Sequence, residues 1–341
     1  KRRFRKLEDL PGLWDIPQED ASSDDKISDL LSSYRKKQTV PNKIIKESDL
    51  DRHLMEVTPR RNELEFFSFG SGSSGNCAYI GIRGMGGVLI DAGVDTNIVL
   101  EGLERNCVPL SKIAGIIITH DHSDHVRYAY ALLRKIPTMK IFCTPRTLTG
   151  ILRRHSISSR IKDYHKQIFK EFEFEAGPLF ITPFEVSHDG SDNVGFSIKA
   201  GEKSFVVATD TGKITERADY YIRRASYLMV EADYDEAMLA KSSYPNYLKE
   251  RIRRDNGHMS NIDTARYLNG IWTEMLTDIF LCHLSDNNNT PELALETVRL
   301  ALTERGVTVG DGSGSSESLK SKVQLSALPR ENMSPHYILR L

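Results

Sequence analysis

The chain of 341 residues lacks several features that would each point to a particular class of protein. It has no apolar run near the roughly 18 residues that a membrane-spanning helix needs, so we expect no contact with a membrane. Its net charge is only −1, so any site for a polyanion must come from a local patch or from bound metal. Its four cysteines form no C-x-x-C pair, and we interpret them as small packed hydrophobic residues.

The composition is that of a soluble globular protein, with 39% hydrophobic and 27% charged residues. The basic residues 1–6 are followed by no apolar stretch, so no secretory signal is expected there. The cysteine usage suits a reducing compartment, which predicts a cytoplasmic location. No sequence feature identifies a protein partner.

Residues 1–62 are predicted to form a weakly structured N-terminal extension, because four prolines and an acidic stretch interrupt it. Residues 63–341 are predicted to form the catalytic domain. Strands are expected at 64–69, 77–82, 88–90, 115–118, 140–143, 180–186, 194–200, 204–208, 227–230, 278–282, 323–328 and 337–339. Helices are expected at 97–106, 126–135, 261–270 and 290–303. This order favours two sheets between layers of helices.

The feature that stands out is the run His120-Asp121-His122-Ser123-Asp124-His125, which follows a short apolar strand. Imidazole and carboxylate groups are ligands for zinc and similar divalent ions. Residues two apart in an extended turn point the same way, so His120 and His122 can bind one ion. Asp124 and His125 can then face a second ion. Three histidines and two aspartates would pack poorly in a core, so metal binding is favoured over a polar surface turn.

This run resembles the signature of the metallo-β-lactamase superfamily, which implies an α/β fold of the αββα sandwich type. The resemblance covers about residues 64–341 and implies four further site residues. Asp91 would brace the site from behind, and His188 would complete the first metal site with His120 and His122. Asp210 would bridge both metals. His283 would complete the second metal site with Asp124 and His125. Asp121 is interpreted as an orienter of a neighbouring group.

Asp210 also separates members of the superfamily. The common β-lactamases carry a cysteine at that position, so a β-lactamase is disfavoured here. A bridging carboxylate suits dinuclear hydrolases of phosphodiesters or of thioesters. A thioester hydrolase of the glyoxalase II type therefore stays open as an alternative. A metal-binding sensor or scaffold without catalysis is the third hypothesis.

Two segments favour phosphodiesters. The first is a Gly/Ser-rich loop at 70–76, whose Ser73, Ser74, Gly75 and Asn76 would bind phosphate through closely approaching backbone N–H groups. The second is the segment 257–261, in which His258 would contact the scissile phosphate or protonate the leaving oxygen. Ser260 would cap the next helix and present its N-terminus to phosphate. A plain flexible turn and an ordinary capped helix remain the alternatives.

Together with His283-Leu284-Ser285 and Asn287-Asn288-Asn289, these segments resemble the bacterial YycJ/WalJ group. That resemblance implies a nuclease acting on nucleic acid, with DNA favoured over RNA and a 5′–3′ exonuclease role. It also implies two divalent ions, zinc first and manganese as the alternative, holding a bridging hydroxide. Asp124, Asp210 and His258 would be the catalytic residues. The stretch from Asp210 to His283 is too short for the inserted domain of the β-CASP branch.

Basic residues flank this site in the sequence. Arg127, Arg134 and Lys135 follow the metal run, while Arg251, Arg253 and Arg254 precede His258. The second cluster would follow a phosphate backbone, or form a solvated helix face.

Overall fold

A computed structural model of the chain describes residues 63–341. The extension predicted at residues 1–62 lies outside the described residues. The first described strand, β1 (Glu63–Gly72), shows how the sheets pack. Leu64 and Phe66 face one hydrophobic core, whereas Phe67 and Phe69 face another. Successive side chains of a strand point to opposite faces, so a strand buried on both faces is apolar almost throughout.

The described residues form two mixed sheets. The first has seven strands in the order β15 (Tyr337–Arg340), β1, β2 (Gly75–Ile82), β3 (Gly86–Ile90), β4 (Ile113–Ile117), β5 (Lys140–Cys143) and β6 (His165–Gln167). The second has eight strands in the order β13 (Val309–Gly310), β14 (Val323–Ala327), β12 (Asp278–Cys282), β11 (Tyr227–Glu231), β10 (Lys203–Ala208), β9 (Val194–Ala200), β8 (Leu179–Glu185) and β7 (Phe174–Ala176).

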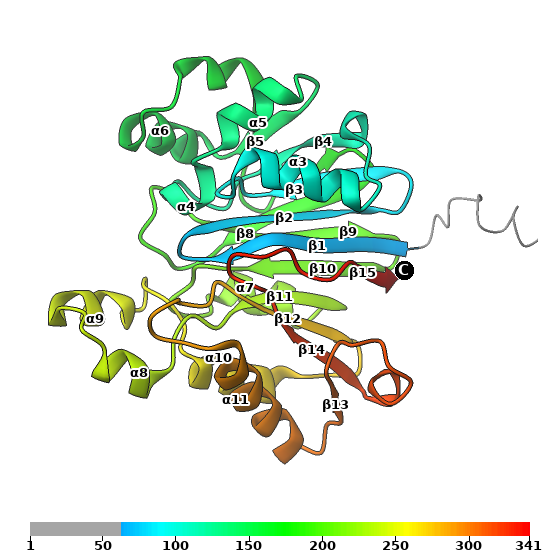
Figure 1. The fold of residues 1–341 in the computed structure, drawn as a ribbon, viewed down its shortest axis with the longest axis vertical. Helices are drawn as coiled ribbons and strands as arrows, with labels where there is room; N and C mark the ends of the chain where they lie inside the picture. Colours follow the sequence, from blue (N-terminus) through cyan, green and yellow to red (C-terminus); the bar gives the residue numbers. More distant parts are fainter. Residues whose placement is uncertain (1–62) are drawn as a thin grey trace, which may run out of the picture. The chain divides into compact units, whose positions relative to one another are not determined.

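Helices cover the outer face of each sheet, so the layers run helix, sheet, sheet, helix (Figure 1). On the first sheet lie α3 (Thr96–Arg105), α4 (Ser123–Val126), α5 (Ala129–Lys135) and α6 (Pro145–Arg154). On the side of the second sheet lie α7 (Glu216–Ile222), α8 (Glu236–Lys241), α9 (Asn246–Ile252), α10 (Asn261–Ile271) and α11 (Pro291–Glu304). Short 3-10 helices are η2 (Leu110–Lys112), η3 (Ser159–Tyr164) and η4 (Ser318–Lys320). The predicted αββα sandwich is confirmed.

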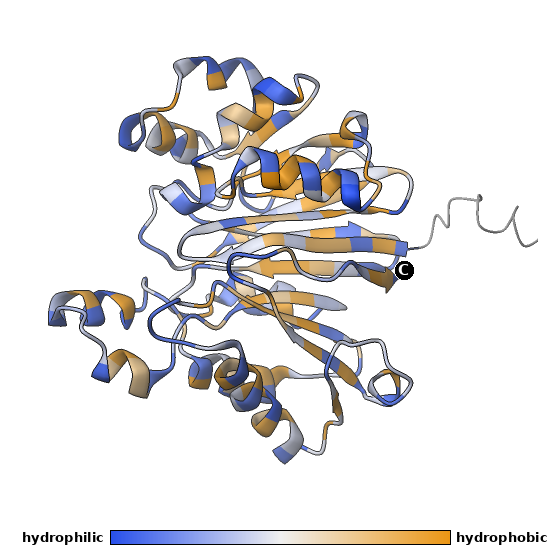
Figure 2. Ribbon diagram, viewed as in Figure 1, coloured by the Kyte–Doolittle hydropathy of each residue, from blue (hydrophilic) through white to orange (hydrophobic). Residues whose placement is uncertain are grey.

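Three hydrophobic cores hold these layers together. The central core lies between the sheets and includes Phe66, Phe196, Phe205 and Phe280. One outer core joins the first sheet to α3, α5 and α6, and the other joins the second sheet to α7, α10 and α11. Figure 2 shows the corresponding concentration of hydrophobic residues along the strands. No helix within residues 63–341 is long and apolar enough to cross a membrane.

The structure corrects two of the predicted elements. The helix expected at 126–135 is broken, because the Tyr128 N–H donates to Ala92 O (2.8 Å) instead of to the preceding turn. Most of the loop expected at 70–76 is strand, since β1 and β2 pair down to Gly72 and Gly75. Only Ser73 and Ser74 form the turn. Small residues are required here because a Cβ on Gly70 would lie 3.0 Å from Arg330 O.

Candidate metal centre

The residues singled out by the sequence meet at one edge of the sandwich. Strands β3 and β4 are parallel, as are β10, β11 and β12, so their carboxyl ends lie on a common edge within each sheet. Asp91, Asp210 and His283 each follow such a strand with a positive φ, of 59°, 50° and 53°. Residues other than glycine rarely adopt this conformation, and such strain concentrates at functional sites.

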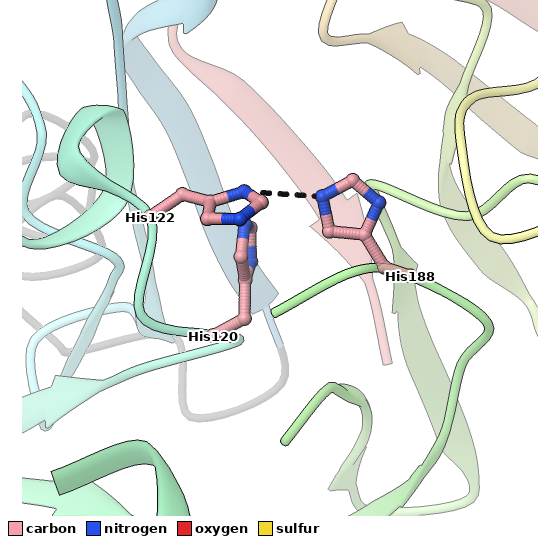
Figure 3. Close-up of side chains that lie close together, drawn as sticks. All are labelled: His120, His122 and His188. Atoms are coloured by element: carbon pink, nitrogen blue, oxygen red, sulfur yellow. Dashed lines mark hydrogen bonds between the residues drawn. The ribbon is translucent and has the colours of Figure 1, made fainter. Parts of the chain in front are cut away.

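The first group consists of His120, His122 and His188, whose rings pack edge to face (Figure 3). His122 Nδ1 lies 3.2 Å from His188 Nε2. His188 is oriented from behind by a hydrogen bond between its Nδ1 and Gly257 O (3.0 Å). His120 is fully buried, its Nδ1 lies 3.0 Å from Thr119 Oγ1, and its Nε2 has no hydrogen-bond partner.

The second group consists of Asp124, His125 and His283. Asp124 Oδ2 lies 3.3 Å from His125 Nε2 and 3.5 Å from His283 Nε2. Asp124 and His125 reach this point because α4 starts at Ser123, directly after the extended residue His122. Asp124 and His125 follow a strand of the first sheet and His283 follows a strand of the second, so their ligand atoms converge from both sheets.

Asp210 lies between the two groups. Its Oδ2 is 3.3 Å from His125 Nε2, and its Oδ1 is 3.3 Å from His283 Nε2 and 3.8 Å from His188 Nε2. The carboxylate is buried, and its Oδ2 also accepts a hydrogen bond from Thr209 Oγ1. One carboxylate therefore contacts histidines of both groups, as a bridging ligand would.

Asp91 braces the second group. Its carboxylate accepts from the Thr119 backbone N–H (2.8 Å) and lies 2.8 Å from His125 Nδ1, which directs His125 Nε2 toward the cluster. Asp121 has no atom in any of the possible metal-binding groups within residues 63–341. It instead accepts from the Ser191 backbone N–H (2.8 Å) and hydroxyl (2.7 Å), which fastens the loop around His120.

The sequence interpretation missed Glu231, a fully buried carboxylate at the end of β11. Its Oε1 lies 2.7 Å from His258 Nδ1 and 3.2 Å from His283 Nδ1. Its Oε2 accepts from the Thr211 N–H (2.8 Å). Glu231 thus orients two histidines at once. An acidic residue directly after a predicted apolar strand was the available signal.

His258 stacks on His283, with ring centroids 5.2 Å apart and an interplanar angle of 11°. Burial acts to lower the pKa of His258, but the carboxylates of Glu231 and Asp233 raise it to about 9. The residue therefore lies beside the candidate ligand His283, and the raised pKa favours its protonated form. Its contact with phosphate or with a leaving oxygen stays a prediction.

Two more neighbours were missed by sequence. Asp189 Oδ1 lies 3.3 Å from His122 Nε2, and its Oδ2 accepts from Arg251 (2.7 Å). Ser71 Oγ accepts from the His283 backbone N–H (3.0 Å), which holds the strained residue in place. Asp189 directly follows the predicted ligand His188, and Ser71 lies in the Gly/Ser-rich segment 70–76, so both stood beside predicted site residues in the sequence.

The residues predicted to bind phosphate lie in different surroundings. Ser73 and Ser74 are exposed at the hairpin turn, whereas Gly75 and Asn76 are buried. Asn76 Nδ2 lies 3.2 Å from Asp124 Oδ2 and also contacts His125 Nε2. Ser260 caps α10 by accepting from the Asp263 N–H (3.1 Å). Contact of these residues with phosphate stays a prediction.

The predicted basic cluster before His258 is partly neutralised. Arg251 pairs with Asp189 at 2.7 Å, and Arg253 pairs with Glu236 at 3.0 Å. Within residues 63–341, Arg254 makes no side-chain ion pair. This cluster therefore offers less free charge to a polyanion than its sequence indicates.

The pKa shifts at the edge run in two directions. Burial acts to lower the pKa of His125 and of His283, but the surrounding carboxylates, Asp210 first, hold both well above the usual range. The pKa values of His120 and Asp210 are shifted the other way. Burial lowers the pKa of His120 well below its usual range, and nearby His125 lowers it further. Burial acts to raise the pKa of Asp210, but His283 and His125 hold it well below its usual range. A neutral imidazole and an ionised carboxylate are the forms that bind metal.

An αββα sandwich with such a His/Asp cluster at its strand edge defines a metal-dependent hydrolase. A family model described as a beta-lactamase superfamily domain matches residues 87–277. Among solved structures, the metallo-beta-lactamase fold protein YhfI from Bacillus subtilis covers 81% of this chain and 100% of its own, with a TM-score of 0.57 and 14% identity. That likeness concerns the fold.

Two curated relatives are more similar in sequence. The exodeoxyribonuclease YycJ of Bacillus anthracis is 31% identical over 252 residues, covering 73% of this chain and 92% of its own. The exodeoxyribonuclease WalJ of Streptococcus pneumoniae (strain D39) is 33% identical over 242 residues, covering 70% and 88%. The chain belongs to the metallo-β-lactamase superfamily and, within it, to the YycJ/WalJ family.

Proposed function

We propose that this hydrolase is a DNA exonuclease that degrades strands from 5′ to 3′ with two divalent ions. The names of the relatives support the DNA substrate. The observation that carries the two-ion proposal is the position of Asp210, whose carboxylate contacts histidines of both groups. Because its substrate would be DNA, we also propose a cytoplasmic location, as the cysteine usage predicts.

The side chains at the edge fit this pair of ions. In the first group, two nitrogens bound to one tetrahedral zinc would lie about 3.3 Å apart, and those of His122 and His188 are 3.2 Å apart. His120 Nε2 is buried without a hydrogen bond, which is costly for a polar atom unless a cation binds it. His120, His122 and His188 would hold one ion.

Asp124, His125 and His283 would hold the other ion, and Asp210 would contact both. All ligand types are nitrogen or carboxylate oxygen, which suits zinc, with manganese as the alternative. When bound, such ions lower the pKa of water and stabilise charge on a phosphoryl oxygen.

The remaining residues would orient and move protons. His258, protonated and held at Nδ1 by Glu231, would donate a hydrogen bond to the phosphate or a proton to the leaving oxygen. Asp91 would keep His125 in its orientation. The exposed turn of Ser73 and Ser74 would contact the nucleic-acid backbone.

Cleavage of duplex DNA carrying a label at either end tests this function. With zinc or manganese, we expect a 5′ label to be released in small products at the earliest times, while a 3′-labelled strand shortens gradually. Matched RNA should be cut more slowly. Early release of the 3′ label would contradict the polarity. Turnover of a glutathione thioester without DNA cleavage would select the thioester hydrolase, and bound metal without turnover of any ester would select the sensor.

Glu231→Gln tests the positioning of the two histidines. Residues that orient metal ligands typically contribute 10- to 100-fold to metal affinity, so we expect zinc affinity to fall by about that factor. Competition with a chelating dye measures it. Glu236→Gln, which changes a half-buried glutamate on α8 that pairs with Arg253, is the matched control and should leave the affinity unchanged. Equal zinc affinity in Glu231→Gln and the unsubstituted protein would refute the positioning role.

A further inference from the structure

Helix α6 carries a basic face that the metal centre does not use. Arg146, Gly150, Arg153 and Arg154 recur at spacings of three, four and seven residues, which places them on one side of a helix. All three arginines are exposed. Arg146 and Arg153 are seven residues apart, so they are separated by about 10 Å along the helix axis.

This face lines a cavity of about 460 Å³. We call it the α6 arginine pocket, and its lining residues are Pro145, Arg146, Thr149, Gly150, Arg153, Arg154 and Ser191. No acidic side chain is among them. Its volume lies within the range of ordinary ligand sites.

Most of the positive charge in the pocket is free. Within residues 63–341, the side chains of Arg146 and Arg153 make no hydrogen bond or ion pair, in contrast to Arg251 and Arg253 on and after α9. Arg154 is the exception, with its Nε 3.4 Å from Asp121 Oδ2. Two unpaired guanidinium groups beside a hollow would attract an anion from solution.

The pocket is also fastened to the metal centre. Ser191 lines the pocket and donates to Asp121, the residue between His120 and His122. Gly150 allows this close approach, because a Cβ there would lie 1.9 Å from Asp121 Oδ2. The pocket is therefore joined to the loop that carries His120 and His122.

The start of α6 is held by the loop that follows His188. Thr144 Oγ1 donates to Asp192 Oδ2 (2.7 Å), and Thr147 Oγ1 donates to Asp192 O (3.1 Å). The arginines thus project from a helix whose position is fixed relative to the metal-binding edge. Figure 1 shows α6 and α4 on the same side of the molecule.

We propose that the α6 arginine pocket binds backbone phosphates of the nucleic-acid strand whose scissile bond lies at the metal centre. The inference rests on the proposed nuclease function. Guanidinium groups match the geometry of phosphate oxygens. Arg146 and Arg153 start about 10 Å apart along the helix axis, which is more than the width of one phosphate and favours a strand over a free anion. The pocket would hold the strand in register without reading its sequence.

The double substitution Arg146→Gln and Arg153→Gln tests this site in the zinc-loaded protein. Binding of labelled single-stranded phosphorothioate DNA, which keeps its charge and resists hydrolysis, is measured by fluorescence anisotropy from about 50 to 200 mM salt. Loss of two phosphate contacts should reduce the slope of log K against log salt by about 1.4. The ratio of the unsubstituted protein's affinity to the variant's would then fall about sevenfold as the salt rises from about 50 to 200 mM.

Arg266→Gln with Lys320→Gln is the matched control, because it removes two positive charges from the side of the second sheet. It should leave the slope unchanged. An unchanged slope in the α6 variant, with a normal melting temperature and zinc content, would overturn the inference. The inference would also be overturned if the α6 variant lost affinity for inorganic phosphate but bound DNA as the unsubstituted protein does. Failure of the unsubstituted protein to bind or cleave DNA would instead contradict the proposed nuclease function. The failure of the pocket and the failure of the function are therefore distinguishable.

Discussion

Asp210→Ala is expected to reduce bound zinc from two ions to at most one and to slow DNA cleavage by roughly a thousandfold. The carboxylate contacts histidines of both groups, so under the two-ion proposal its loss would remove a ligand from each ion. Metal ions contribute several kcal/mol to stabilising charge in the transition state, and each 1.36 kcal/mol corresponds to a factor of ten in rate. Zinc content by mass spectrometry and cleavage rates measure the two effects.

Asp255→Ala is the control for this variant. Asp255 is exposed and pairs with Lys213 on the surface, where an ion pair contributes little to stability. Its substitution should leave both zinc content and rate unchanged. Two tightly bound zinc ions in Asp210→Ala, with an undiminished rate, would contradict the bridging role.

Gly93→Ala is expected to destroy the second metal-binding group by steric overlap alone. A Cβ on Gly93 would lie 1.5 Å from Asp124 O and 2.8 Å from the Asn76 backbone N, so the backbone that presents Asp124 must move. Forcing extra volume into a packed site costs about 1–3 kcal/mol, and backbone contacts this short favour the upper end. Urea denaturation measures the stability, and zinc titration measures the loss of one ion.

Gly270→Ala provides a glycine control within α10. No atom lies within 4 Å of a Cβ built there, and the residue is exposed. Alanine is favoured over glycine in a helix, so this variant should gain about 0.5–1 kcal/mol and keep both ions. If Gly93→Ala behaved in the same way, Asp124 would not depend on the close approach of Gly93.

The sequence predicted the αββα layers and the position of the edge, because long apolar strands and a motif directly after a strand are local signals. His188, Asp210 and His283 were assigned by resemblance. The fold brings His188 and Asp210 to His120, and His283 to Asp124 and Asp210. Their roles as metal ligands remain predictions.

The rest depends on tertiary contacts that local patterns do not contain. Helix α6 was not predicted, although Thr144 at the N-cap and Pro145 at the first position are local signals for a helix start. Thr147, Thr149 and Gly150 lower its helix propensity, and contacts with Asp121 and Asp192 stabilise it. Glu231 lies 27 residues from His258 in sequence, so only the parallel pairing of β11 brings it there. Gly70 and Gly72 indicated a loop, because their packing against Arg330 is a tertiary contact that the local sequence does not contain.

Anomalous scattering from crystals of the zinc-loaded protein tests the central claim most directly. Two peaks about 3.5–4 Å apart are predicted. One should be bound by His120, His122 and His188, the other by Asp124, His125 and His283, with Asp210 contacting both. A single ion at full zinc occupancy, or two ions of which only one contacts Asp210, would contradict the two-ion account.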